Sequence, residues 1–187
     1  TEYYKERVKS GGERIRSAAA KDIDCPSELL TWLVQHAEKS HVRGSAYQNP
    51  NLPEEVMWSF ANDREARKNL YGFRDPIEEL LAQNIAASPR VLKSLSNSDR
   101  FKTLYYVRKN PNVSKEVALD VITRMLNYPL DSWLWYDTLL DERLTPAHID
   151  FALDLQDQKF RATLARNDSL TLSDLKVLSR DPYKVDA

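Results

Sequence analysis

Residues 46–56 read AYQNPNLPEEV, and residues 107–117 read VRKNPNVSKEV. The two stretches share Asn-Pro-Asn, a Glu and a closing Val at the same offsets, which is five identities in eleven positions. Internal similarity of this kind indicates that the chain is built from equivalent structural units. These residues therefore decide the fold class, and the rest of the chain can be aligned to them.

Four weaker copies of the pattern occur elsewhere, at residues 19–29, 81–92, 138–149 and 164–175. We call the Asn or Asp at the fourth position of the pattern the anchor. The six anchors are Asp22, Asn49, Asn84, Asn110, Asp141 and Asn167, separated by 27, 35, 26, 31 and 26 residues. The basic unit is therefore about 26 residues long, with two insertions.

The residue types around each anchor are typical of a turn between two helices. Asn and Asp tolerate left-handed backbone angles, so we expect the anchor to end the first helix in that conformation. We expect prolines at the first position of the second helix, where the missing amide hydrogen costs nothing, at Pro26, Pro53, Pro89 and Pro146. Hydroxyl side chains are good caps for the same helix, and they occur at Ser88, Thr145 and Thr171.

Apolar residues recur three or four positions apart on both sides of the anchors, which indicates two helices with one buried stripe each. No stretch alternates with a period of two between hairpin turns, so a sheet is not expected. A single short helix pair cannot bury its own stripe, whereas stacked pairs share a continuous core. The sequence therefore predicts an all-α solenoid of about six helix-turn-helix repeats.

The unit length and the Asn-Pro-Asn turn, followed by Pro or Ser, Glu and an aliphatic residue, resemble the leucine-rich repeat variant family. The resemblance covers most of residues 15–187, and the copies at 46–56 and 107–117 carry it best. It implies alternating α and short 3₁₀ helices in a right-handed superhelix. The two longer intervals leave room for a second full α-helix, so an armadillo- or HEAT-like stack is the alternative. The iron–sulfur cluster of some family members is not expected, because Cys25 is the only cysteine.

We expect residues 1–14 to form an N-terminal leader or cap and residues 15–187 to form the repeat array. Residues 181–187 resemble the start of a further first helix, as at Asp157, so the last repeat is expected to be incomplete.

Composition excludes several classes of protein. The 187 residues carry 27 Lys and Arg against 28 Asp and Glu, so the formal charge is −1 and bulk electrostatics gives no reason to bind nucleic acid or anionic membrane. The apolar stretches are far shorter than the roughly 20 residues that span a bilayer. One cysteine is typical of a reducing compartment, and we expect a cytoplasmic protein with no membrane partner.

Catalytic and metal-binding patterns are weak. His36, His41 and His148 have no acidic or thiol partner at metal-ligand spacing, and no Gly-rich phosphate loop or nucleophile elbow occurs. Cys25 begins a helix, where exposed amides can activate a thiol, but its repeat equivalents Leu52 and Val113 favour apolar packing. We therefore expect neither catalytic residues nor a metal or other cofactor.

Aromatic residues gather at Trp133, Trp135 and Tyr136, and again at Tyr105 and Tyr106. Such rings are common contacts at interfaces. Alternate helix positions face opposite sides, so we expect at least one of them to lie in the core.

Basic residues recur at fixed offsets from the anchors and would align into a ribbon if the units stack. The position before the anchor is basic at Lys21, Lys109 and Arg166, and the position six before it is basic at Arg16, Arg43 and Arg161. An ordinary solvated helix face is the alternative interpretation of both sets.

The leading hypothesis is a non-enzymatic scaffold that binds a protein or peptide. Its expected contact residues are Trp133, Trp135, Tyr136, Tyr105, Lys109 and Arg166. The alternatives are a nucleic-acid-binding HEAT-like module of the DNA-glycosylase type, by analogy of architecture alone, and a structural spacer within a larger protein.

Overall fold

The computed structural model describes residues 2–63, 77–127, 134–154 and 157–180. Thirteen α-helices and no strands occur in these ranges, so the prediction of an all-α fold is confirmed. The helices are α1 (Glu2–Ser10), α2 (Glu13–Lys21), α3 (Ser27–His36), α4 (Ser40–Gln48), α5 (Glu54–Asn62), α7 (Ile77–Gln83), α8 (Pro89–Leu95), α9 (Phe101–Lys109), α10 (Lys115–Leu126), α11 (Leu134–Leu139), α12 (Pro146–Asp154), α13 (Gln158–Leu164) and α14 (Leu172–Ser179).

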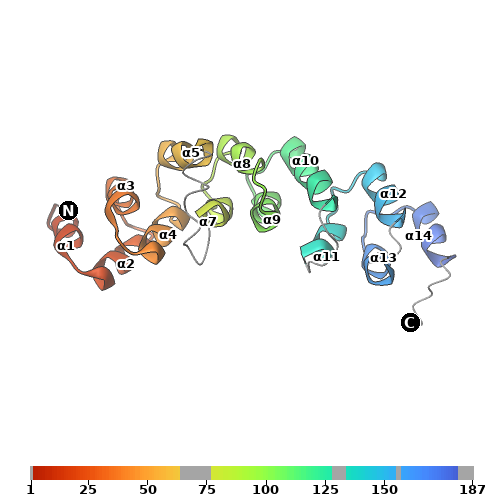
Figure 1. Cartoon of the computed structure of the whole chain (residues 1–187), viewed down its shortest axis with the longest axis horizontal. Coiled ribbons are helices and arrows are strands. Elements are labelled where there is room, and N and C mark those ends of the chain that lie inside the picture. Colours follow the sequence, from red (N-terminus) through yellow and green to blue (C-terminus); the bar gives the residue numbers. More distant parts are fainter. Residues whose placement is uncertain (1, 64–76, 128–133, 155–156, 181–187) are drawn as a thin grey trace. The chain divides into compact units, whose positions relative to one another are not determined.

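The chain divides into two compact units, Thr1–Ser114 and Lys115–Ala187. In the first unit, α2 packs on α4, α4 on α7 and α7 on α9, and α5 packs on α8. Figure 1 shows α2, α4, α7 and α9 as one row of this unit and α3, α5 and α8 as a second row above it. In the second unit, α11 packs on α13, and α12 packs on both α10 and α14. The expected leader, residues 1–14, contains α1 and the start of α2, whereas the expected start of a further repeat at 181–187 lies outside the described residues.

Both helices of each repeat are α-helical in the described ranges, and the short 3₁₀ helices implied by the family resemblance do not occur there. Within each unit the core lies between the helices that pack on one another. Leucines dominate it in the first unit, where Leu30, Leu33, Leu81, Leu92 and Leu95 are fully buried. In the second unit the fully buried residues include Ile122, Met125 and Trp135.

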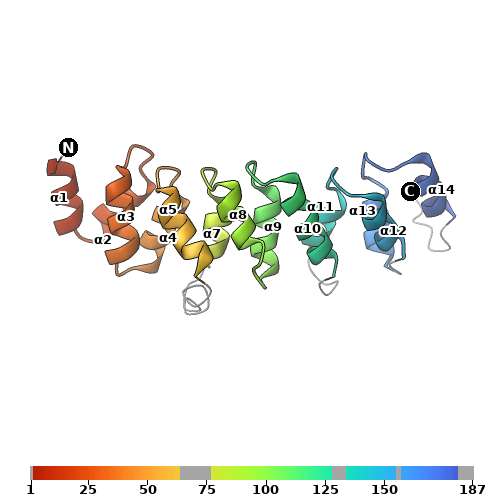
Figure 2. The same cartoon turned by 90° about the horizontal axis from the view of Figure 1, so that it is seen from above.

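All six anchors form the same turn. In each, the side-chain oxygen accepts a hydrogen bond from the amide two residues later, and the main-chain carbonyl accepts one from the amide three residues later. Figure 2 shows the turns that follow α2, α4, α7 and α9 along one edge of the first unit. The anchors at 22, 49, 84, 110, 141 and 167 are therefore structurally equivalent, as the repeat predicts.

The anchor asparagines also connect each turn to the one before it. The Nδ2 of Asn110 donates to the carbonyl oxygens of Ala82 and Asn84, at 2.8 and 2.9 Å. Asn49, Asn84 and Asn167 make the corresponding pair of bonds to the preceding turn, and all four side chains are buried. We call this series of bonds the asparagine ladder. Buried main-chain carbonyls need donors, and a side-chain amide supplies two hydrogens while its oxygen still closes its own turn.

The first anchor of each unit is an aspartate, which has no hydrogen to donate when ionised. Asp22 accepts instead from the hydroxyl of Tyr4 at 3.2 Å, and Asp141 accepts from Nε and Nη2 of Arg143 at 2.8 and 2.7 Å. Within each unit, Asp therefore occupies the turn that has no earlier anchor turn to bind, and Asn occupies every later one.

The Asn-Pro-Asn sequence has a second function in the ladder. Asn112 donates to the carbonyls of Ile85 and Ala87 at 2.7 and 3.1 Å, and Asn51 donates to the carbonyl of Ile23. These bonds require Asn two residues after the anchor, which explains why the copies at 46–56 and 107–117 match each other best.

Two predictions about the turn are wrong. The anchors are not left-handed: Asn49 has φ −69° and ψ 126°, and no residue other than Gly has positive φ in the described ranges. The bond from the side-chain oxygen to the amide two residues later closes the turn with an extended anchor instead. Pro26 and Pro53 lie one residue before their helices, at the N-cap. Pro89 and Pro146 do begin their helices, and Ser88 and Thr171 cap theirs as predicted.

Candidate functional site

The column of residues that precede the anchors lies on the surface. Lys21, Gln48, Gln83 and Lys109 are exposed in the first unit, and Leu140 and Arg166 are exposed in the second. In the first unit each of these residues ends a first helix, so helix geometry holds it beside the anchor turn, whereas in the second unit α11 ends at Leu139 and α13 at Leu164, before the residue in question. The predicted alignment of Lys109 and Lys21 on one exposed edge of the first unit agrees with the structure.

Aromatic and basic side chains meet on α9. The rings of Tyr105 and Tyr106 lie edge to face, with centroids 5.3 Å apart, and both side chains are half-buried. The Nζ of Lys109 lies 5.9 Å from the centroid of Tyr105, one helical turn away, within the range of a cation–π contact. Lys102 precedes Tyr106 by one turn and is exposed. We call Lys102, Tyr105, Tyr106 and Lys109 the α9 face.

Two buried glutamates of α7 fix the start of α9. Glu79 is bound to Nη2 of Arg100 at 3.3 Å and to Nζ of Lys102 at 3.2 Å. Glu78 accepts from the hydroxyl of Ser98 at 2.5 Å. Sequence reasoning did not identify these positioning residues, although adjacent glutamates in an otherwise apolar helix were the available signal.

The aromatic residues that the sequence analysis grouped in the second unit pack mostly in its interior. Trp135 is fully buried, and its ring centroid lies 5.3 Å from that of Phe160. A partner therefore cannot contact Trp135 on the surface, which corrects its assignment as a contact residue. Tyr136 is half-buried and its ring stacks on that of Phe160, with the centroids 5.0 Å apart. Trp133 lies outside the described residues.

The arginines six residues before the anchors do not form a binding ribbon. Arg16 donates to the carbonyls of Val8 and Lys9 at the end of α1, Arg43 to those of Ala37 and Glu38 after α3, and Arg161 to that of Leu153 in α12. The last carbonyls of a helix lack intrahelical partners and carry partial negative charge, so these cations stabilise the helix ends. Neither the ribbon nor the solvated-face interpretation describes them.

Arg166 lies in a polar hollow of the second unit with a volume of about 360 Å³. The hollow is lined by Leu140, Glu142, Arg166, Asn167 and Asp168. Two carboxylates flank the single cation, so the electrostatic preference for an acidic partner is weaker here than at the α9 face.

The remaining candidate for chemistry is Cys25. Its side chain is buried, and burial together with the nearby Asp22 carboxylate raises the pKa of the thiol to about 11. The thiol therefore stays protonated at neutral pH and is a poor nucleophile. Within the described ranges no three His, Cys, Asp or Glu side chains form a group that could hold a metal ion.

Comparison with known proteins found no matching family model, no similar curated protein and no similar solved structure. In the part of the chain that the structure describes, no helix is both long and apolar enough to cross a membrane.

Proposed function

We propose that the chain is a non-enzymatic scaffold of the right-handed α-solenoid type that binds an acidic segment of a protein or peptide on the α9 face. The observation that carries the proposal is the side-by-side placement of Tyr105 and Lys109 on a face where two tyrosine rings and two lysines are accessible. Tyrosine supplies contact area at low entropic cost, and lysine supplies attraction for carboxylates.

Rigid support favours this face over the other predicted residues. The ion pairs of Glu79 with Arg100 and Lys102 hold the first turn of α9, and the asparagine ladder holds its end through Asn110. A preorganised surface loses less conformational entropy on binding than a mobile one. Acidic groups with an aromatic or aliphatic neighbour are the chemistry that this face fits.

The test is selection of a displayed random peptide library on the full chain, followed by fluorescence-anisotropy titration of the enriched peptides. We expect enrichment in Asp and Glu beside an aromatic or aliphatic residue. Y105A and K109E should each weaken binding by about tenfold, since truncation of an interface anchor typically costs about 1–2 kcal/mol. K93E, at an exposed position of α8, is the matched control and should bind as the parent chain does.

The same titration separates the alternatives. A single-stranded oligonucleotide that binds more tightly than any selected peptide, with affinity falling steeply between about 50 and 200 mM salt, would favour the nucleic-acid module. Selected peptides that bind Y105A and K109E as well as the parent chain would refute the α9 face. A library without any enrichment would favour the structural spacer.

A further inference from the structure

Within the first unit, α2 fills a slot formed by the helix pair that follows it. It packs against both α3 and α4. On α4, Val42 is 1% exposed and Ala46 is fully buried, and Ala19 of α2, which precedes its anchor by three residues as Ala46 does, is also buried at 3%. The position that differs between the two helices is therefore the one seven residues before the anchor.

The equivalent slot between α1 and α2 is a groove of about 470 Å³. Ile15 stands seven residues before its anchor, as Val42 does, but is 37% exposed. Ile15, Ala18 and Ala19 line the groove with Val8 of α1; Ala18 is exposed like Ile15, whereas Val8 and Ala19 are buried at the base. No helix covers Ile15 and Ala18 in the described part of the chain, so one apolar side of the groove is left accessible.

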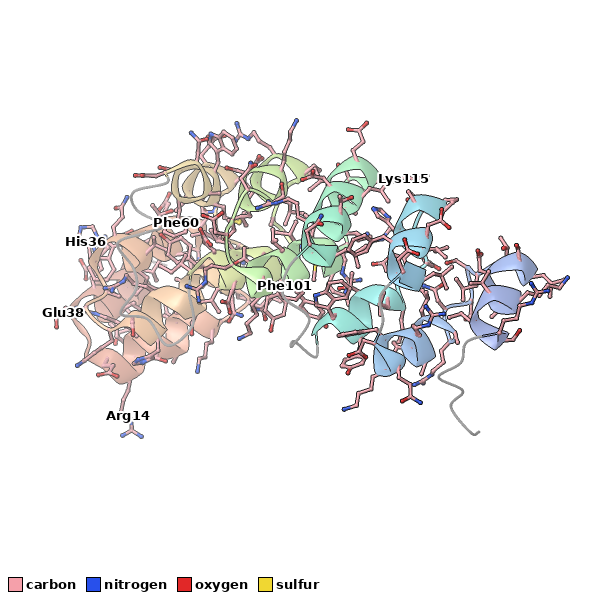
Figure 3. All side chains as sticks on the ribbon, turned by 45° about the vertical axis from the view of Figure 1, so that its right-hand side comes forward. Arg14, His36, Glu38, Phe60, Phe101 and Lys115 are labelled. Carbon is pink, nitrogen blue, oxygen red and sulfur yellow. The ribbon has the colours of Figure 1, made fainter. Side chains whose placement is uncertain are left out.

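The two ends of this α1–α2 groove carry opposite charges. Hydrogen bonds from Arg16 to the last turn of α1 place the start of α2 beside the end of α1, and the bond from Tyr4 to Asp22 closes the other end. Arg7 and Arg14 line the first end, and Asp22 lines the second. Neither Arg7 nor Arg14 has an ion pair within the described residues, and Figure 3 shows Arg14 extended into solvent.

We infer that the α1–α2 groove binds an amphipathic helix of a partner protein that has carboxylates in its first turn, a cation in its last turn and an apolar stripe between them. The orientation follows from the slot that α2 fills, because α2 and α4 run in the same direction toward the edge that carries the anchor turns (Figure 2). A helix parallel to α2 places its first turn at Arg7 and Arg14 and its last turn at Asp22.

Helix electrostatics favours the same orientation. Carboxylates are stable in the first turn of a helix and cations in the last, because they complement the helix dipole. The charged residues of the partner that the groove attracts therefore also stabilise the helical conformation of the partner segment. This surface is separate from the α9 face, and the inference does not rest on the proposed function.

The test is fluorescence-anisotropy titration of the full chain with a stapled synthetic helix of about 14 residues, long enough to form about four turns. The peptide carries Glu in its first turn, Lys in its last turn and Leu at helical spacing between them. We expect saturable binding with Kd below about 1 mM. R14E should weaken it by at least about fivefold and should improve binding of a peptide with Glu and Lys exchanged.

A second variant tests the apolar part of the groove without altering the core. A18R places a long side chain at an exposed position on the groove wall and should abolish binding, whereas K93E should have no effect. Y105A and K109E should also leave this binding unchanged, so failure here and failure at the α9 face are distinguishable.

Three results of the titration would overturn the inference. These are the absence of binding up to about 1 mM peptide, equal binding by R14E, A18R and the parent chain, and equal affinity for the exchanged peptide. A dimer of the parent chain alone, dissociated by R14E in analytical ultracentrifugation, would identify a second copy as the occupant and would also overturn it.

Discussion

The side-chain amide of Asn110 donates a hydrogen bond to the main-chain carbonyl of Asn84, its own counterpart one turn earlier, at 2.9 Å. The same side chain closes its own turn through its oxygen, which accepts from the amide of Asn112 at 3.0 Å. One residue thus forms its own turn and joins it to the preceding one. This double use explains why asparagine recurs at the anchor.

Replacing Asn110 with Asp tests the donors of the ladder. The variant keeps the shape and the acceptor oxygen, but loses two buried hydrogen bonds and directs a carboxylate at two carbonyl oxygens. We expect N110D to lower the free energy of unfolding by about 3 kcal/mol in urea titration. N97D, at an exposed position, should change it by less than about 0.5 kcal/mol. Similar losses for the two variants would contradict the ladder as a source of stability.

Truncation of Glu79 tests the support of the α9 face. E79A leaves a cavity and removes the partner of Arg100 and Lys102, whose side chains are 44% and 47% exposed and can be solvated. We therefore expect a loss of about 2 kcal/mol, and a smaller one of about 1 kcal/mol for E79Q, which preserves the packing. Thermal unfolding by circular dichroism measures both, and a larger loss for E79Q than for E79A would refute the packing contribution.

Trp135 and Tyr136 separate packing from surface contact. W135A removes a fully buried ring next to Phe160 and should cost about 4 kcal/mol, whereas Y136A should cost about half of that. W135F should cost less than W135A, because it also removes a buried indole N–H that has no hydrogen-bond acceptor among the described atoms. Urea titration measures all three, and a loss for W135A as small as that expected for an exposed position would show that the ring contributes little.

Stability of the second unit should fall as the solution becomes acidic, because burial lowers the pKa of His148 below its ordinary value of 6.5. Its Nδ1 accepts from the amide of Thr145 at 3.1 Å, so the Nε2–H donates to the hydroxyl of Thr123 at 2.8 Å. The unfolded chain takes up a proton near pH 6.5, whereas the folded chain does so only at lower pH. The contribution of neutral His148 to the free energy of unfolding is therefore fully present above pH 6.5 and is lost as the pH falls below that value.

The slope of unfolding free energy with pH should reach at most about 1.4 kcal/mol per pH unit for this one group. H148Q keeps a polar side chain at the third position of α12 and should reduce the slope between about pH 7 and 5. Chemical denaturation at several pH values provides the measurement. An unchanged slope in H148Q would assign the acid sensitivity to other groups.

Sequence reasoning predicted the all-α class and the positions of the six anchor turns, because those depend on local turn chemistry and apolar spacing. It treated Asn and Asp as equivalent at the anchor, since both can close the turn. The difference between them depends on carbonyls contributed by a residue about 26 positions earlier, such as Asn84 for Asn110, and such contacts exist only in the folded chain.

The candidate site was predicted less well for the same reason. Tyr105 and Lys109 lie together because they are one turn apart on one helix, which spacing alone reveals. Arg16 and Arg161 both lie six residues before an anchor, which is the constant offset expected of a ribbon. Their guanidinium groups instead donate to main-chain carbonyls at the ends of neighbouring helices. The buried state of Trp135 depends on α13, whose packing against α11 is not encoded in the local pattern.

Hydrogen exchange of asparagine side-chain amides, followed by ¹⁵N-resolved NMR of the full chain, tests the asparagine ladder most directly. Side-chain NH₂ groups of Asn49, Asn84, Asn110 and Asn167 should exchange with solvent at least about a hundredfold more slowly than those of exposed Asn62 and Asn97. Exchange of the four anchor amides at the rate of Asn62 and Asn97 would show that the turns are not joined through their asparagines.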